Sequence, residues 1–550
     1  MGAMLIIFFT VYLCAAVLGL RYYTHMLQLS SYQFQGYFRF LKTTVTKYGL
    51  HAGAAAAIFG AGFFEYAQAV EETDMNKPAI GLFVLAIVFL VLMAVMYIPR
   101  KAKKKFVVTK RVQRLFVTYT VLFVITVLVA VLCVALGADW SAGKHAIAAA
   151  FIAAYIGFLP LIVALSNLIN KPVENSINQW FIDDAKRILK EHQGLRIIGV
   201  TGSYGKTSVK YYLTTLLSEK YRVLMTPESY NTPMGIVRTI REKMVPTHEI
   251  FVCEMGARHL HDIKEITDIV HPDDGILTSI GYQHLETFHS LENIVSTKYE
   301  LLDAVDEKEK EEGNAGKGKH LKFANGDNEI IRANMKYKDA ITYGVSDDCD
   351  YRVSDISVTG AGTTFNVTTP DGETAEFNTK LVGRHNVENI AGAIAVAASF
   401  GVPMNKLKMA VRRIQPVPHR LELVRHGAVA ILDDAYNSNP NGAKVALETL
   451  ALFDNSVKIL VTPGMVELGE KEDEYNEEFG RQAANVCDYI ILVGEKQTQA
   501  IKKGALEAGF AKDKLFVKNG LTEATQLMYE LEAGREKVIL LENDLPDNYT

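Results

Sequence analysis

The first 170 residues contain apolar runs about as long as a membrane-spanning helix. A helix needs about 20 residues to cross the hydrocarbon core of a bilayer. Three runs reach that length without an Asp, Glu, Lys or Arg, at residues 79–98, 115–138 and 146–169. We therefore expect residues 1–170 to form an α-helical membrane domain with four to five spans.

Two further runs are weaker candidates for spans. Residues 4–20 are slightly shorter and lack the basic start and the small-residue cleavage site of a signal peptide, which favours an uncleaved span. Residues 49–70 are rich in Ala and Gly and contain Glu65, so the sequence leaves open whether this segment crosses the bilayer.

The distribution of Lys and Arg predicts the orientation of the spans. Residues 100–114 are strongly basic, residues 21–48 contain four Lys or Arg, and residues 71–77 are mostly acidic. Cytoplasmic loops carry the excess of Lys and Arg. Five spans with an external N-terminus satisfy all three segments and return the chain to the cytoplasm near residue 170. We thus expect a multi-pass plasma-membrane protein whose remaining domains are cytoplasmic.

Composition narrows the function classes of the remaining chain. The 58 basic and 62 acidic side chains nearly balance, which gives no sign of nucleic-acid binding. The five cysteines are scattered without a CxxC pair, which argues against a zinc ribbon and a disulfide framework. At 550 residues the chain is long enough for several domains.

The stretch GVTGSYGKTSVKYYL, residues 199–213, has the features of a phosphate-binding loop between a strand and a helix. Gly202 and Gly205 would let backbone N–H groups turn toward phosphate oxygens, Lys206 would reach the β- and γ-phosphates, and the Thr207 hydroxyl would bind Mg²⁺. The spacing departs from GxxxxGK[ST], because Val200 occupies the position of the first glycine.

Three further residues strengthen this interpretation. We expect Glu254 at the end of one strand, His284 near the end of the next, and Lys298 on the helix that follows. Open α/β sheets bind ligands at the carboxyl ends of their strands. Glu254 and His284 are thus candidate Mg²⁺ ligands. Taken singly, each could equally be an ordinary surface or capping residue.

The chain resembles the Mur ligases, ATP-dependent amide-forming enzymes of peptidoglycan synthesis, and among them the branch that adds D-alanyl-D-alanine. The resemblance rests on TGSYGKTS, YNTPMG, CEMGA, SIGYQHLETF, STKYELL, NGDNE, GRHNVENIAGAIAVA, PVPHRLE and DDAYNSNP, which occur in the family's order between about residues 195 and 445. It implies ATP and Mg²⁺ as cofactors, and a carboxylate and an amine as substrates, joined through an acyl phosphate.

The resemblance also implies roles for individual residues. Glu254 and His284 would hold Mg²⁺ together with Thr207, and Lys298 would be the lysine that many members carbamylate. Lys206, Lys298 and His284 would be catalytic. The residues expected at the nucleotide are Gly202, Ser203, Gly205, Lys206, Thr207, Ser208, His385, Asn386, Asn389, Arg420 and Asp434.

Two regions depart from the family's pattern. The membrane segment replaces the domain that grips the substrate's uridine nucleotide, and VILLENDLPDNYT follows the last strand where a Lys-Gly-Ser-Arg-like loop is usual. The expected organisation is a membrane domain (1–170), a linker helix (171–194), a P-loop ATP-binding domain (195–415) and a Rossmann-like domain (416–550). Within it we expect a charged surface loop at 303–320 and short antiparallel strands at 341–380.

The leading hypothesis is therefore a membrane-anchored amide ligase acting on a cell-wall precursor, including lipid-linked ones, beside other cell-wall synthesis proteins. A ligase that builds an anionic peptide polymer is the alternative within the same chemistry. A P-loop ATPase that drives transport would carry an LSGGQ-like signature, which the sequence lacks. A catalytically inactive membrane scaffold would not need Lys206, Glu254 and Lys298 together. A further alternative is that the spans serve only to localise the enzyme beside partner proteins.

Overall fold

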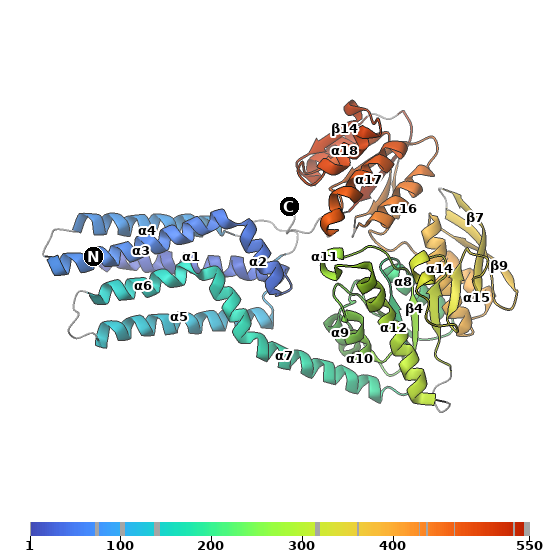
Figure 1. Ribbon diagram of the computed structural model, residues 1–550, viewed down its shortest axis with the longest axis horizontal. Helices are drawn as coiled ribbons and strands as arrows, with labels where there is room; N and C mark the ends of the chain where they lie inside the picture. Colours follow the sequence, from blue (N-terminus) through green and yellow to red (C-terminus); the bar gives the residue numbers. More distant parts are fainter. Residues whose placement is uncertain are drawn as a thin grey trace. The chain divides into compact units, whose positions relative to one another are not determined.

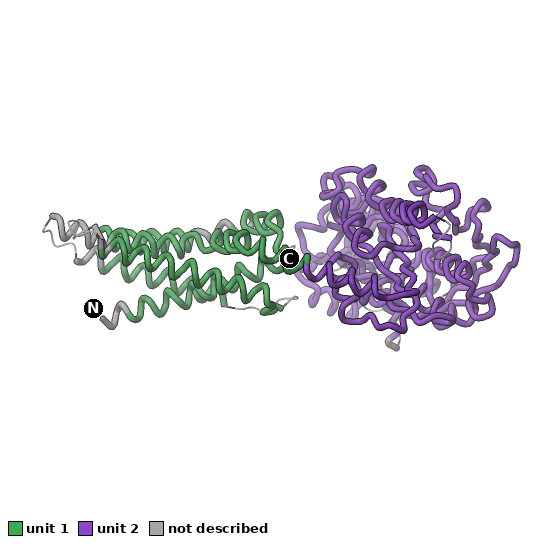
Figure 2. Tube along the Cα trace, turned by 90° about the horizontal axis from the view of Figure 1, so that it is seen from below, with its two compact units in different colours: residues 1–179, 546–550 green, residues 180–545 purple. Residues whose placement is uncertain are grey.

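The computed structural model describes residues 2–71, 76–98, 105–136, 143–313, 319–359, 362–427, 429–435, 438–466, 468–531 and 534–543. The chain divides into two compact units, and the boundary lies inside a helix, between Gln179 and Trp180 (Figure 2). We call residues 1–179 unit 1 and residues 180–545 unit 2.

Unit 1 is a bundle of helices (Figure 1). The helices are α1 Gly2–Leu29, α2 Phe34–Thr43, α3 Val45–Glu71, α4 Asn76–Met96, α5 Lys110–Leu136, α6 Gly143–Gly157 and α7 Leu159–Glu191. The last of these continues past the end of the apolar run, through the expected linker helix and into unit 2.

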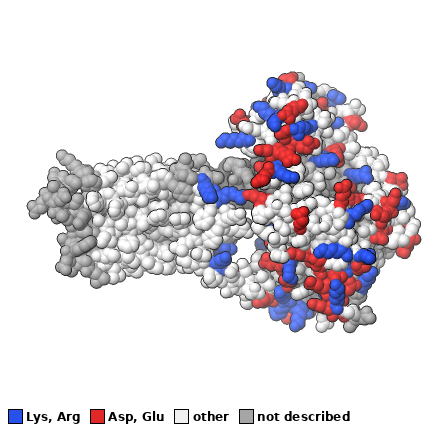
Figure 3. All heavy atoms as spheres, viewed as in Figure 1, with Lys and Arg blue, Asp and Glu red and all other residues white. Residues whose placement is uncertain are grey.

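Polarity in unit 1 is inverted relative to a soluble bundle. Large apolar side chains such as Val117 and Leu128 are more than half exposed, whereas Tyr23, Tyr97 and His51 are almost completely buried. The three buried groups bond to one another, with Tyr23 Oη 2.8 Å from Tyr97 Oη and His51 Nε2 2.7 Å from Tyr97 Oη. Figure 3 accordingly shows the middle of the bundle without charged side chains.

Two helices of the described chain are long and apolar enough to cross a membrane, Ile6–Leu29 and Lys110–Cys133. The count rises to three if the bent pair α6–α7 is one span, while Gly49–Phe63 and Ile80–Met96 are shorter apolar helices. The search is confined to the described residues, and residues 137–138 of the expected run 115–138 lie outside them.

The expected span at 146–169 is a bent pair of helices, because the chain turns by 76° between α6 and α7. Pro160 has no N–H, so the Ile156 carbonyl lacks its usual partner one turn later. His51 Nδ1 lies 2.9 Å from that carbonyl oxygen and replaces the missing donor. A side chain from α3 thus satisfies the backbone at the break.

Unit 2 contains a sheet with the strand order β2-β3-β1-β4-β5-β6-β7-β8-β9 among its described residues. The strands are β1 Arg196–Thr201, β2 Val223–Met225, β3 Ile250–Glu254, β4 Asp274–Leu277, β5 Lys322–Asn325, β6 Ile341–Gly344, β7 Tyr351–Thr359, β8 Gly362–Thr368 and β9 Thr374–Thr379. The pairs from β2 to β7 are parallel. Only β7–β8 and β8–β9 are antiparallel, so the expectation of antiparallel strands fails for β6, which extends the parallel sheet.

Helices cover both faces of this sheet. They are α8 Lys206–Leu217, α9 Pro233–Lys243, α10 Asp262–Val270, α11 Leu285–Phe288, α12 Leu291–Glu312, α13 Glu329–Ala333, α14 Arg384–Ser399 and α15 Met404–Arg413. Alternate residues of β3 point to opposite faces, with Val252 in the core beneath α8, α14 and α15 and Phe251 in the core beneath α9, α10 and α12. Helix α12 runs through residues 303–312, so the charged loop expected there is wrong over those residues.

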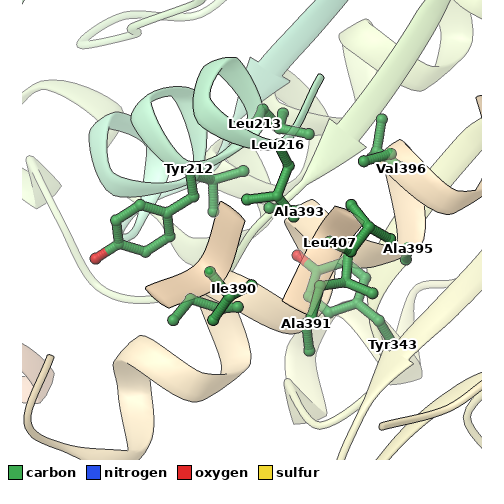
Figure 4. Packing of buried hydrophobic residues seen from close by; sticks show 14 of the residues in the cluster. Tyr212, Leu213, Leu216, Tyr343, Ile390, Ala391, Ala393, Ala395, Val396 and Leu407 are labelled. Carbon is green, nitrogen blue, oxygen red and sulfur yellow. The ribbon is translucent and has the colours of Figure 1, made fainter. Parts of the chain in front are cut away.

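Helix α14 packs closely against α8. Its alanines Ala391 and Ala393 lie among Tyr212, Leu213 and Leu216 of α8 in the same buried cluster (Figure 4). Small side chains allow two helices to approach, so the start of α14 is held near the start of α8.

A second sheet in unit 2 has the order β10-β11-β15-β12-β13-β14 among the described residues. Its strands are β10 Glu422–His426, β11 Val429–Asp434, β12 Val457–Thr462, β13 Tyr489–Val493, β14 Leu515–Lys518 and β15 Lys537–Glu542. All pairs are parallel except β10–β11. Its helices are α16 Pro440–Ala451, α17 Glu472–Val486, α18 Gln499–Glu507 and α19 Leu521–Glu530, with short 3-10 turns at Gly469–Lys471 and Lys512–Lys514.

Candidate functional site

The loop between β1 and α8 requires glycine at two positions. Gly202 has φ +153°, and a Cβ there would lie 2.1 Å from Thr278 Oγ1. Gly205 has φ +77°, and a Cβ there would lie 2.4 Å from Asn389 Oδ1. Both side chains would collide with neighbours in backbone conformations that other residues rarely adopt. The loop therefore packs directly against the segment after β4 and against α14.

The segment after β4 holds this loop in place. Ser203 N donates to Ser279 O (2.7 Å), Ser203 Oγ donates to Gly281 O (3.1 Å), and Tyr204 N donates to Ser279 Oγ (2.9 Å). These partners were not identified from the sequence, although they lie in the SIGYQH motif. They fix the loop geometry without using the side chains expected at the nucleotide, apart from Ser203.

Lys206 begins α8 and bends back over the loop. Its Nζ donates to Gly202 O (2.6 Å) and Ser203 O (2.9 Å). The pKa of Lys206 is lowered to about 8, chiefly by burial; the Glu254 charge opposes this change and the Arg420 charge adds to it. Ser208, one turn into α8, is buried. The Lys206 ammonium thus lies over the loop as a poorly solvated cation, a favourable state for contacting an anion.

Thr207 and Glu254 are in contact, as the expected magnesium site requires. Thr207 Oγ1 donates to Glu254 Oε1 (3.0 Å), and Asn231 Nδ2 donates to the same oxygen (3.0 Å). Glu254 is the last residue of β3 and is 1% exposed. A hydroxyl beside a carboxylate suits a hard cation such as Mg²⁺.

Lys210 is a member of this cluster that the sequence analysis missed. Its Nζ lies 2.9 Å from Glu254 Oε2, and its side chain is completely buried. Burial alone would raise the pKa of Glu254, but Lys210 and Lys206 outweigh it and hold that pKa below its ordinary value. A lysine four residues after Lys206 shares its helix face, and this spacing could have revealed the contact.

Lys298 lies near the same charges on helix α12. It is 2% exposed, and its pKa is well below the ordinary value because of burial and the Lys206 charge, while Glu254 acts in the opposite direction. The structure therefore brings Lys206, Glu254 and Lys298 into one electrostatic neighbourhood, with Lys298 favoured as a neutral amine.

His284 has a different position from the one expected. Strand β4 ends at Leu277, and His284 directly precedes α11 with φ +53°. The residues between them dock the phosphate loop instead of extending the strand. Among the described residues, no group of three or more His, Cys, Asp or Glu side chains is arranged to hold a metal ion. Mg²⁺ at Thr207 and Glu254 would therefore need oxygens from substrate phosphates, water or a modified Lys298.

Three of the residues expected at the nucleotide, His385, Asn386 and Asn389, lie in the first turns of α14. Asn389 faces Gly205, and His385 Nδ1 is buried without a hydrogen-bond partner. Burial lowers the pKa of His385 to about 4, so its ring is neutral. Asn386 accepts from Tyr212 Oη (2.7 Å) and donates to Val382 O (2.9 Å), which commits its amide to joining α14 and α8. His385 and Asn389 remain the groups available to a ligand here.

Arg420 and Asp434 come from the second sheet and the segment before it. The Arg420 charge lowers the pKa of both Lys206 and Lys210, which places Arg420 near the phosphate loop. Asp434 Oδ1 accepts from Leu421 N (3.1 Å), and burial raises the pKa of Asp434 to about 6.

Glu542 is a second site residue that the sequence analysis missed. It pairs with Asp434 across β11 and β15, both at the end of their strands. Its side chain is fully buried, Ser438 Oγ donates to Oε1, and Oε2 has no hydrogen-bond partner. Two carboxyl groups therefore meet at the carboxyl edge of the second sheet.

Comparison with known proteins agrees with this arrangement. Residues 200–397 match the Mur ligase middle domain, and residues 419–542 match the glutamate ligase domain of Mur ligases. The chain is 31% identical over 356 residues to the UDP-N-acetylmuramoyl-tripeptide–D-alanyl-D-alanine ligase of Bacillus subtilis, covering 64% of this chain and 73% of the relative. The enzyme of that name from Escherichia coli is 27% identical over 343 residues, covering 61% and 74%.

Solved structures show the same fold. MurF from Acinetobacter baumannii superposes with a TM-score of 0.59 at 23% identity, covering 68% of this chain and 78% of that one. MurF from Thermotoga maritima, in complex with ADP, superposes with a TM-score of 0.58 at 25% identity, covering 67% and 80%. The chain therefore belongs to the Mur ligase family of ATP-dependent, ADP-forming amide ligases.

Proposed function

We propose that this protein is a membrane-anchored ligase that joins a carboxylate to an amine on a cell-wall precursor, through an acyl phosphate. The observation that carries the proposal is the cluster around β1 and β3: a glycine loop, Lys206 above it, and Thr207 in contact with Glu254. The relatives carry the name of a ligase with a uridine-nucleotide substrate.

The residues of this cluster would serve phosphoryl transfer to the substrate carboxylate. Backbone N–H groups of the loop, as in a P-loop, and Lys206 would bind the β- and γ-phosphates and offset the charge that develops as the γ-phosphoryl group moves. The carboxylate oxygen attacks that group and ADP leaves. The amine then attacks the acyl carbon, loses a proton, and inorganic phosphate leaves as the amide forms.

Mg²⁺ would be held by the hydroxyl of Thr207 and the carboxylate of Glu254, with a carbamylated Lys298 and, as the family resemblance implies, His284 as further ligands. When bound, it would neutralise phosphate charge during transfer. Lys298 is suited to carbamylation because CO₂ adds to the neutral amine, and burial favours that form. The added carboxylate would give this position an anionic oxygen that can bind a cation. His385, Asn389, Arg420 and Asp434 would contact the nucleotide.

The membrane part of the proposal rests on unit 1. Its outer surface is apolar and its interior contains hydrogen-bonded tyrosines, the arrangement expected of a bundle in lipid. The Lys and Arg bias favours a cytoplasmic location for unit 2. The Mur ligase matches begin at residue 200, so unit 1 lies outside the matched region. We infer that the substrate is lipid-linked or held at the membrane surface, where anchoring raises its effective concentration.

The test measures ADP release by purified full-length protein. Release that needs both a carboxylate and an amine substrate, and that Lys206→Ala abolishes while far-UV circular dichroism is unchanged, supports the ligase. ADP release that needs neither substrate and that accompanies transport would instead indicate a transport ATPase. If the amide products form an anionic peptide polymer, the enzyme's substrate is that polymer and not a cell-wall precursor. Equal rates on soluble and lipid-linked acceptors would refute the membrane-presented substrate.

A further inference from the structure

One end of unit 1 concentrates positive charge. Lys105 precedes α5, while Lys110, Arg111 and Arg114 lie in its first turns. Gln28 at the end of α1 bonds to both N and O of Val107, and Arg21 lies over the Phe106 ring at 5.2 Å, so this segment is docked on α1. Figure 3 shows blue side chains at one end of the bundle only, among the residues it colours. We call this region the cationic end.

The carboxylate near the cationic end is already paired with an arginine. Between residues 99 and 114 the sequence contains no acidic residue but eight Lys or Arg. Glu174 of α7 is bound by Arg114 through two hydrogen bonds, of 2.6 Å from Nε and 2.8 Å from Nη2. That pair is neutral overall, so the charge of Arg111 beside it has no carboxylate of its own among the described side chains of the bundle.

Arg111 is held in a defined orientation. Its guanidinium lies over the Tyr32 ring at 3.8 Å, and its Nη2 donates to Asn167 Oδ1 (3.2 Å). Asn167 Nδ2 donates to Tyr32 O (3.0 Å), which closes the arrangement between α7 and the α1–α2 turn. The Arg111 Nε is buried and has no hydrogen-bond acceptor. Nearby on α7, Ser166 is completely buried and its hydroxyl is also without a partner.

This arrangement is costly unless an anion completes it. A partly buried guanidinium needs a partner for its charge and its N–H groups. Its position in the first turn of α5 adds a further cost, because the helix dipole places positive charge there as well. Arginine's planar fork matches the oxygens of a phosphate, and Tyr32 and Asn167 have already fixed its plane.

We infer that Arg111 is the centre of a binding site for the phosphate group of a lipid. The inference rests on the proposed membrane placement of unit 1, which puts the cationic end at the level of the cytoplasmic headgroups. The apolar outer surface of the bundle would hold the chain of that lipid. The site is separate from the nucleotide site of unit 2, and it would hold the anionic head of a lipid-linked substrate.

The test is a calorimetric titration of full-length protein in dodecyl maltoside, a detergent without phosphate, with empty micelles as the blank. Dodecyl phosphate and inorganic phosphate serve as probes. We expect dodecyl phosphate to bind and Arg111→Gln to weaken binding at least about tenfold, the loss of one charge-assisted contact. Lys42→Gln, which removes an exposed charge of α2, is the matched control and should bind like wild type.

Several results would overturn the inference. These are unchanged affinity of Arg111→Gln, an equal loss in Lys42→Gln, or inorganic phosphate binding as tightly as dodecyl phosphate. If Arg111→Gln fails to fold, Arg111→Lys keeps the charge but loses the fork, and it should still bind more weakly than wild type. Since the titration contains neither ATP nor ligase substrates, its failure would leave the ADP-release test of the ligase untouched.

Discussion

Lys210 Nζ lies 2.9 Å from Glu254 Oε2, and both side chains are almost completely buried. Glu254 also accepts hydrogen bonds from Thr207 and Asn231 on its other oxygen. Taking two charges out of water is expensive, and their attraction offsets the cost only while both are present. The pair therefore keeps a carboxylate ionised at the end of β3, where the proposed metal site needs one.

Removing Lys210 should destabilise the protein strongly. Lys210→Met leaves the buried Glu254 charge unpaired, for which we expect a loss of about 3–5 kcal/mol, seen as a lower Tm. Lys210→Met combined with Glu254→Leu should recover much of that loss, because no charge is then left unpaired. Arg238→Met, which breaks the exposed Arg238–Glu242 pair, is the control and should cost under about 1 kcal/mol. Equal losses of stability in Lys210→Met and Arg238→Met would show that the buried pair contributes no more to stability than the exposed pair.

Lys298 should be replaceable by a small carboxylate. Lys298→Ala removes the amine that forms the proposed carbamate, so we expect ADP release to fall at least about 100-fold and to recover in part with added formate or acetate. Lys310→Ala, at the exposed end of the same helix, should keep full activity and show no response to either anion. Full activity of Lys298→Ala would exclude the carbamate role.

Glu542 should make stability depend on pH. Burial raises the pKa of Asp434 to about 6 and that of Glu542 well above its ordinary value, and the Asp434 charge further raises the pKa of Glu542. The folded state then binds protons more tightly than the unfolded chain. Protonation thus favours folding below the folded-state pKa, and ionisation opposes it as pH rises through about 6.

Glu542→Gln removes one of these charges at constant shape. We expect its Tm to exceed that of wild type at pH 8 by a few degrees, with a smaller difference at pH 5. Glu523→Gln, an exposed change on α19, should show no pH-dependent gain. A constant difference at the two pH values would mean that the carboxyl pair is not ionising as described.

Topology provides the remaining prediction. A reporter in the basic segment 100–114 should read as cytoplasmic, on the same side as the C-terminus, whereas one in the acidic segment 71–77 should read as external. Accessibility of the same two insertions to a membrane-impermeant label measures this directly. An external reading at 100–114 would overturn the orientation, and with it the headgroup level assigned to Arg111.

Local pattern in the sequence determined much of this protein. Apolar length predicted the helices of unit 1, and the motifs of residues 195–550 predicted the strand–loop–helix at 199–213 and the strand that ends at Glu254. The glycines and Lys206 marked the loop between β1 and α8, whose two required glycines the structure confirms. These features could be read because each depends on residues within one or two turns or strands.

Only the tertiary structure decided which distant groups meet. Strand order brought Glu542 beside Asp434, and helix packing brought Lys210 onto Glu254 and His51 onto the carbonyl freed by Pro160. It also placed β6 parallel to its neighbours and kept the charged residues after 303 helical. The Lys210 and His51 contacts arise because a buried polar group needs a partner, which a side chain from another element provides. That requirement is a property of the packed chain, and local sequence spacing does not encode it.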